Sequence, residues 1–221
     1  EIADRDWSSD VCSSDLLDIF TICDSEGNNL TNVYKRVWSW GSMNMSGRWY
    51  GSVVNMPRVD RLGLTIDGEP VVEIDYVAIH PRILWSMYNK PLLAFPQDIY
   101  AEITDSKSPT DRKMAKLALL IYLNGDEKEA KLAITGEFNA LTQEEKKEYT
   151  LGKPSLLWHL INDYFLSEGM PVKEDYKGDN NIGLKLQNQD SELAAIVIER
   201  LRMVGVQIGR ASCRERVSSP V

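Results

Sequence analysis

The sequence predicts an α+β fold with a short antiparallel sheet and several packed helices. Two β-rich runs, 61–66 and 71–76, flank Asp67-Gly68, which is a strong signal for a β-hairpin. From residue 78 onward, apolar residues recur at helical spacing in several segments. The first half of the chain therefore supplies the predicted strands, and the second half supplies most of the helices.

Both ends of the chain are expected to be foreign to this fold. Residues 6–16 resemble one reading frame of a sequencing-library adapter, and residues 208–217 resemble the opposite adapter. We therefore expect adapter-derived tails at 1–16 and 208–221, neither of which packs on the fold, and a natural segment at 17–207 that is cut at both ends. Ordinary Ser-rich disordered tails are the alternative interpretation.

The natural segment has the bulk properties of one domain or of part of a larger one. The whole chain has a formal net charge of −8. The first sixteen residues contribute −4 and the last fourteen contribute +2, so residues 17–207 carry −6. An acidic total argues only weakly against nucleic acid, because local basic patches still bind phosphate. Cys23 is the single cysteine of residues 17–207, which excludes a disulfide framework in this segment. A single cysteine fits a reducing cytoplasm, and no apolar run is long enough to span a bilayer, so we expect a cytoplasmic protein without a membrane segment.

The predicted elements follow one another in a simple order. The region 34–50, rich in Trp, Tyr, Arg and Gly, is expected to form loop and short strand, and the hairpin follows it. A first helix is expected at 78–89, with Pro81 in its first turn. A second should run from Pro109 to Asn124, with Ser108 as its N-cap. Further helices are expected at 127–133, 143–149, 155–168 and, after a polar loop at 173–183, at 189–204.

The run 75–85, DYVAIHPRILW, places a carboxylate between an apolar strand and the next helix. It resembles motif A of the family A DNA polymerases and, more loosely, of the single-subunit phage-type RNA polymerases. The resemblance implies that Asp75 binds the catalytic metal, with the carbonyl of Tyr76 beside it, and Mg²⁺ suits such oxygen ligands. Taken alone, an Asp that caps the following helix is the simpler interpretation.

The position of His80 bears on the nucleotide that would be used. DNA-synthesising members of the family commonly hold a Glu there, which screens the sugar 2′-position. The resemblance therefore implies that His80 contacts the nucleotide, and it leaves open whether the product is DNA or RNA.

The segment 44–48, NMSGR, resembles the Thr/Asp-x-x-Gly-Arg element that precedes motif A, with Asn in place of Thr or Asp. The resemblance implies that Arg48 contacts nucleic acid. Independently of it, cations lie here among aromatic residues, as in phosphate-binding sites with stacking surfaces. Packing of the aromatic residues in the core or at its rim is the alternative. The residues concerned are Lys35, Arg36, Trp38, Trp40, Arg48, Trp49 and Tyr50.

Residues 111–125 resemble motif B of the same polymerases. Arg112 and Lys116 are four residues apart on the predicted helix and share a face, and the resemblance implies that both hold the triphosphate of the incoming nucleotide. Tyr122 is assigned to the nucleotide as well, although Leu123 follows it where the family has Gly. A cationic first turn opposes the helix dipole, which favours a bound anion; an ordinary charged helix face is the alternative.

Residues 186–195 resemble the Gln-bearing helix that leads into motif C. The resemblance implies that Gln187 lies near the primer terminus or the template. The His-Asp pair of motif C occurs nowhere in the chain. We therefore expect an incomplete polymerase palm that lacks the second catalytic carboxylate.

These resemblances imply a parent that extends nucleic acid, a template-dependent nucleotidyltransferase of a phage or mobile element. Its partners would be template, primer and nucleoside triphosphates, and its cofactor Mg²⁺. The fragment itself is expected to be inactive, and one groove should hold Arg48, Asp75, Arg112, Lys116 and Gln187. The alternatives are a non-catalytic nucleic-acid-binding module of a mobile element, and a metal-dependent phosphoesterase that uses Asp75 with His80 or His159.

Overall fold

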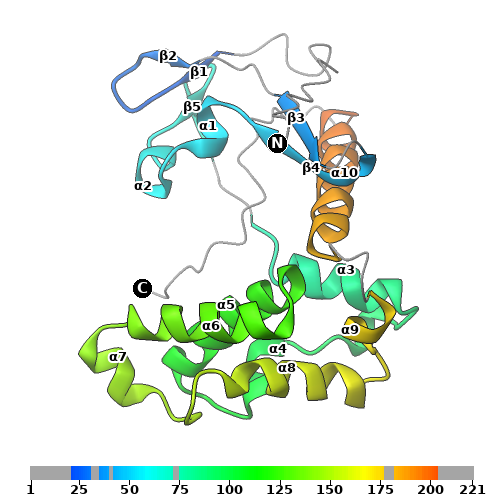
Figure 1. Cartoon of the computed structure of the whole chain (residues 1–221). Coiled ribbons are helices and arrows are strands. Elements are labelled where there is room, and N and C mark those ends of the chain that lie inside the picture. Colours follow the sequence, from blue (N-terminus) through cyan, green and yellow to red (C-terminus); the bar gives the residue numbers. More distant parts are fainter. Residues whose placement is uncertain (1–20, 31–34, 40–41, 72–74, 177–181, 204–221) are drawn as a thin grey trace, which may run out of the picture. The chain divides into compact units, whose positions relative to one another are not determined.

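The computed structural model describes residues 21–30, 35–39, 42–71, 75–176 and 182–203 (Figure 1). The chain has the predicted α+β composition of short antiparallel strands and helices. Its described residues divide into two compact units: those up to Ile79 and from Lys185 onward form the first, and those from His80 to Leu184 form the second. The two expected tails, 1–16 and 208–221, lie outside the described residues.

The first unit contains a four-stranded antiparallel sheet in the order β2-β1-β5-β6. Its strands are short and belong to two hairpins that meet where Ile22 pairs with Ile66. Ile22, Val53 and Leu64 form the buried core beneath the sheet. The elements are β1 (Ile22–Cys23), β2 (Asn29–Leu30), β5 (Thr65–Ile66), β6 (Glu69–Pro70) and the short helices α1 (Ser52–Asn55) and α2 (Arg58–Arg61).

The hairpin predicted at Asp67-Gly68 is confirmed. Both residues have positive φ, 51° and 83°, as a two-residue type I′ turn requires. The strand predicted at 71–76 is wrong in its bounds, because β6 ends at Pro70, which has no N–H to continue a ladder. Residues 72–74 lie outside the described residues, and Asp75 is not in a strand.

A second antiparallel pair, β3 (Lys35–Ser39) with β4 (Ser42–Tyr50), occupies the region that was expected to form loop and short strand. Val37 pairs with Arg48 and Trp38 with Ser46, so Gly47 is left over as a β-bulge. A bulge shifts the side-chain alternation by one residue. The strand therefore lacks the two-residue period by which it could have been recognised in the sequence.

Helix α10 (Ile182–Met203) begins well before the predicted residue 189. Its part from Lys185 onward belongs to the first unit and lies beside β3 and β4 (Figure 1). The Ser191 hydroxyl of this part donates to the Gly47 carbonyl of β4, and Asp190, Ser191 and Ala194 are all buried. Leu193, Ile196 and Val197 are partly exposed.

The second unit is helical, and α5 (Pro109–Asn124) contacts α4, α6, α7 and α8. Met114, Ala118 and Tyr122 of α5 are fully buried in its core. The other helices are α3 (Ile79–Met87), η2 (Leu92–Ala94), α4 (Ile99–Thr104), α6 (Glu127–Asn139), α7 (Gln143–Glu148), α8 (Leu156–Ser167) and α9 (Val172–Asp175).

The start of α5 is as predicted. The Ser108 hydroxyl accepts from the backbone N–H of Asp111, and Pro109 occupies the first turn. Helix α7 begins with a capping box between Thr142 and Glu145. Helix α4 was not predicted, although Asp98 caps it by accepting from the N–H groups of Tyr100 and Ala101.

Candidate nucleic-acid interface

The Ser46-Gly47 bulge of β4 is the structural centre of the segment that resembles Thr/Asp-x-x-Gly-Arg. Both residues have positive φ, 66° and 75°. The Gly47 carbonyl accepts a hydrogen bond from Nε of Arg36 at 3.1 Å and another from the Ser191 hydroxyl. Residues of β3, β4 and α10 therefore meet at one carbonyl oxygen.

Glycine is required at position 47 for two reasons. Its φ lies in the left-handed region, which side chains other than glycine rarely adopt. A Cβ there would also lie 3.0 Å from the Asn188 amide nitrogen and 3.1 Å from the Arg36 guanidinium. The glycine of this segment thus permits the close approach of β4 to α10.

Arg36 is held on several sides. Its terminal nitrogen donates to the Glu192 carboxylate at 2.6 Å, and its guanidinium lies 5.1 Å from the Trp38 ring and 5.4 Å from the Trp49 ring. Only 14% of the side chain is exposed. Arg36 and these two indoles therefore serve packing within the unit, which was the alternative considered for the aromatic residues.

Arg48 and Gln187 are placed differently from Arg36. Arg48 follows the bulge on β4, and Gln187 lies on α10 next to Asn188, which approaches Gly47. Both are partly buried, and neither side chain makes a hydrogen bond or ion pair to another described residue. The structure thus joins the two elements that carry the predicted nucleic-acid contacts.

Asp75 is an exposed carboxylate of the first unit, in the connection that precedes α3. Its Oδ1 accepts from the backbone N–H of Tyr76 at 2.9 Å. Across the described residues, no cluster of three or more His, Cys, Asp or Glu side chains could hold a metal ion. One exposed carboxylate does not make a Mg²⁺ centre, so these residues do not fit the implied cofactor and no chemical step is derived through it.

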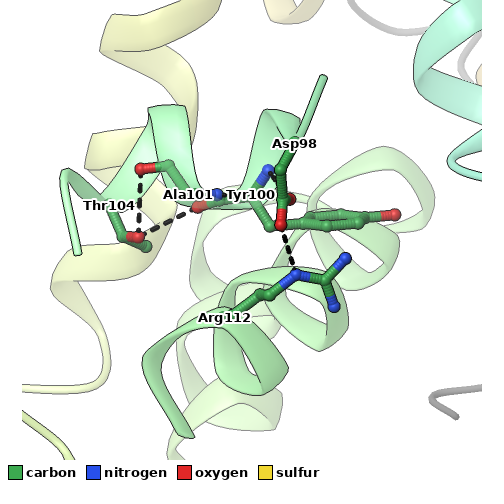
Figure 2. A network of polar contacts seen from close by, with 5 residues as sticks. All are labelled: Asp98, Tyr100, Ala101, Thr104 and Arg112. Atoms are coloured by element: carbon green, nitrogen blue, oxygen red, sulfur yellow. Dashed lines mark hydrogen bonds and ion pairs between the residues drawn. The ribbon is translucent and has the colours of Figure 1, made fainter. Parts of the chain in front are cut away.

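In the second unit, Arg112 of α5 binds another helix of the same unit. Its Nε donates to Oδ2 of Asp98, the N-cap of α4, and its guanidinium lies 5.2 Å from the Tyr100 ring (Figure 2). Lys113, the next residue, pairs with Glu145 of α7 at 2.6 Å. These cations of the first turn of α5 are thus balanced by carboxylates of α4 and α7. Lys116 lies one turn further along α5 and is partly buried.

Tyr122 and His80, both predicted to contact the nucleotide, are buried. The Tyr122 hydroxyl donates to Asn162 at 3.1 Å, and its ring packs on Trp158 and Phe165. Burial raises the pKa of the Tyr122 phenol well above its usual range. Its predicted contact with a nucleotide stays a prediction, and it would require this core to open.

The predicted site residues are divided between the two units. Arg48, Asp75, Tyr76 and Gln187 belong to the first unit, and His80, Arg112, Lys116 and Tyr122 to the second. The common groove expected for them joins both units and stays a prediction. Comparison with protein-family models, with curated proteins and with solved structures finds no match to this chain. None of the helices in the described ranges is long and apolar enough to cross a membrane.

Sequence reasoning missed the residues that hold the Gly47 bulge. Arg36 was considered only as a phosphate ligand, and Ser191 and Glu192 only as part of a helix. No local signal connects Arg36 with Glu192, which lie 156 residues apart. The Gly-Arg pair itself was the one available signal, because a glycine inside a strand often marks a bulge or a close approach of backbones.

Proposed function

We propose that this chain is the nucleic-acid-binding part of a template-dependent nucleotidyltransferase, a DNA or RNA polymerase of a phage or mobile element. It binds primed template through Arg48 of β4 and Gln187 of α10. The observation that carries the proposal is the Gly47 carbonyl, which ties the strand with Arg48 to the helix with Gln187.

The chemistry of the two side chains supports this role. The side chain of Arg48 has no ion pair with another described residue, and an arginine in this state can neutralise a phosphate and release condensed counterions. A glutamine amide both donates and accepts, so it can contact sugar or base edges. An Arg and a Gln on two joined elements thus offer the two kinds of contact that hold a duplex end in register.

Nucleotide binding and Mg²⁺ belong to the proposal for the longer parent. Arg112 would have to leave Asp98 in order to bind a triphosphate, so the phosphates would compete with a carboxylate for the guanidinium. Asp75 would need a second carboxylate, which the polymerase resemblance places in motif C. We propose that the chain by itself binds primed template without extending it.

The test measures the anisotropy of a labelled primed DNA template as the full chain is added at several salt concentrations. Arg48→Ala should weaken binding about tenfold, which corresponds to about 1.4 kcal/mol, and should reduce the salt slope by about one. Arg58→Ala is the matched control, because Arg58 is an exposed arginine of α2 in the same unit. Equal affinities of Arg48→Ala and the unaltered chain would refute the proposal.

A non-catalytic nucleic-acid-binding module is the second candidate. It is favoured by the pairing of Arg112 with Asp98 and by the burial of Tyr122, which engage two of the predicted nucleotide ligands within the unit. The two candidates differ in triphosphate binding. A polymerase fragment should bind a nucleoside triphosphate, and Lys116→Ala should weaken that binding; a module should show no such binding.

A further inference from the structure

We infer that Arg36, Ser191 and Glu192 form a clamp on the Gly47 bulge that positions Arg48 for nucleic acid. Glu192, an acidic residue, would then favour the binding of a polyanion. The inference rests on the proposed function and adds three positioning residues to it.

The clamp holds one peptide group from two directions. Arg36 reaches the Gly47 carbonyl from β3 at 3.1 Å, and Ser191 reaches the same oxygen from α10. Glu192 closes the arrangement, because it binds the terminal nitrogen of Arg36 at 2.6 Å while Nε of Arg36 serves Gly47. One donor to this carbonyl is thus Ser191 of α10, and the other, Arg36, is held by the next residue of that helix, Glu192.

Arg48 follows this carbonyl directly along the chain. The Gly47 carbon and the Arg48 nitrogen share one planar peptide unit, so the orientation of the carbonyl fixes the direction in which the chain enters Arg48. A loosened bulge would leave Arg48 to be ordered on binding. Ordering a flexible segment costs conformational entropy that then reduces the affinity.

Electrostatics alone predicts the opposite effect of Glu192. About half of its side chain, 54%, is exposed, and a carboxylate near a nucleic-acid site repels phosphate. Removal of the carboxylate should therefore tighten binding if charge is its only contribution. The clamp predicts weaker binding, so the sign of the change distinguishes the two explanations.

The experiment compares Glu192→Ala with Glu199→Ala by anisotropy of the same labelled primed template. Glu199 is an exposed glutamate of the same helix, so its substitution makes the same change in net charge and in helix propensity. We expect Glu192→Ala to weaken binding about fivefold, and Glu199→Ala to leave the affinity unchanged or slightly higher. Ser191→Ala, which is neutral, should also weaken binding.

A double-mutant cycle shows whether the clamp acts through Arg48. Glu192→Ala should cause no further loss of affinity in an Arg48→Ala background. A loss of equal size in both backgrounds would show general damage to the unit and would overturn the clamp. Thermal unfolding of each variant, followed by circular dichroism, confirms that the compared proteins are folded.

The outcomes separate the clamp from the proposed function. If Arg48→Ala weakens binding and Glu192→Ala leaves it unchanged or tightens it, the clamp is wrong and the proposed function stands. If Arg48→Ala binds as tightly as the unaltered chain, the proposed function fails, and the clamp with it.

Discussion

Asp111 and Tyr149 show how single residues of the second unit serve structure rather than chemistry. Asp111 is fully buried, and its carboxylate accepts hydrogen bonds from Ser106 and from both the backbone and the side chain of Thr150. These hydrogen bonds offset the free-energy cost of burying a carboxylate. Asp111 opens the segment that resembles motif B, and these contacts give it a role in joining α5 to the chain after α7.

The Tyr149 ring packs on Phe138, and its buried hydroxyl makes no hydrogen bond to another described residue. Burial, with a smaller contribution from the Asp111 carboxylate, raises the pKa of Tyr149 from 10.0 to about 12. Tyr149→Phe removes the buried hydroxyl and keeps the ring, so we expect it to raise the free energy of unfolding at pH 7 by up to about 1 kcal/mol.

The pH dependence of this residue has a definite sign. A phenol with a higher pKa in the folded state contributes stability that is fully present below about pH 10 and is lost as pH rises towards about 12. Tyr149→Phe should therefore lose less stability over this interval than the unaltered chain. Urea unfolding at a series of pH values measures the effect, and a steeper decline in the variant would contradict it.

At the scale of elements, the sequence predicted best where side chains mark an end of the element. Ser108 and Pro109 located the start of α5, and Asp67-Gly68 located the hairpin. The region of β3 and β4 was predicted as loop and short strand, and the extent of the strands was missed because the bulge at Gly47 interrupts their alternation. Helix α4 was missed because its six residues are too few for a helical period to emerge.

The contact between α4 and α5 gives a prediction on stability. Asp98 both caps α4 and pairs with Arg112, whereas Arg112 contributes only a partly exposed ion pair and a contact with Tyr100 (Figure 2). Asp98→Ala should therefore destabilise the protein by about 1–2 kcal/mol, and Arg112→Ala by less than about 1 kcal/mol. Asp98→Asn retains a capping oxygen and should fall between them in urea unfolding. A larger loss for Arg112→Ala than for Asp98→Ala would contradict this assignment.

The contact between β4 and α10 gives a second prediction on stability. Gly47 and Gly27 both have positive φ, 75° and 83°, but only Gly47 has neighbouring atoms within reach of an added Cβ. Gly27→Ala therefore measures backbone strain alone, about 1 kcal/mol, and Gly47→Ala should cost about 1–3 kcal/mol more. Urea unfolding of the two variants gives the difference. Equal losses would show that α10 does not constrain the bulge.

At the scale of the whole molecule, the predicted site could not be assembled from sequence order. The motif matches predicted that Asp75 and Arg112 line one groove, but the two residues belong to different units of the chain. The ion pair of Arg36 with Glu192 depends on a fold in which residue 192 returns to the first unit. Local sequence patterns predict helix caps and turns, whereas contacts between distant segments depend on the tertiary structure and leave no such pattern.

The last prediction concerns catalysis and follows from the lack of a metal-ligand cluster among the described residues. Because the described residues provide no cluster of metal ligands around Asp75, the chain should bind primed template and add no nucleotide to it, with or without Mg²⁺. A longer protein in which a strand with a His-Asp pair is joined to this chain should add nucleotides in a primer-extension assay when Mg²⁺ is present.

Asp75→Asn in that longer protein should abolish extension and leave salt-sensitive binding unchanged, because Asp75 is an anion that does not hold the template. Asp60→Asn, an equivalent change at an exposed position of α2, is the control. Extension that survives Asp75→Asn would remove this carboxylate from the chemistry.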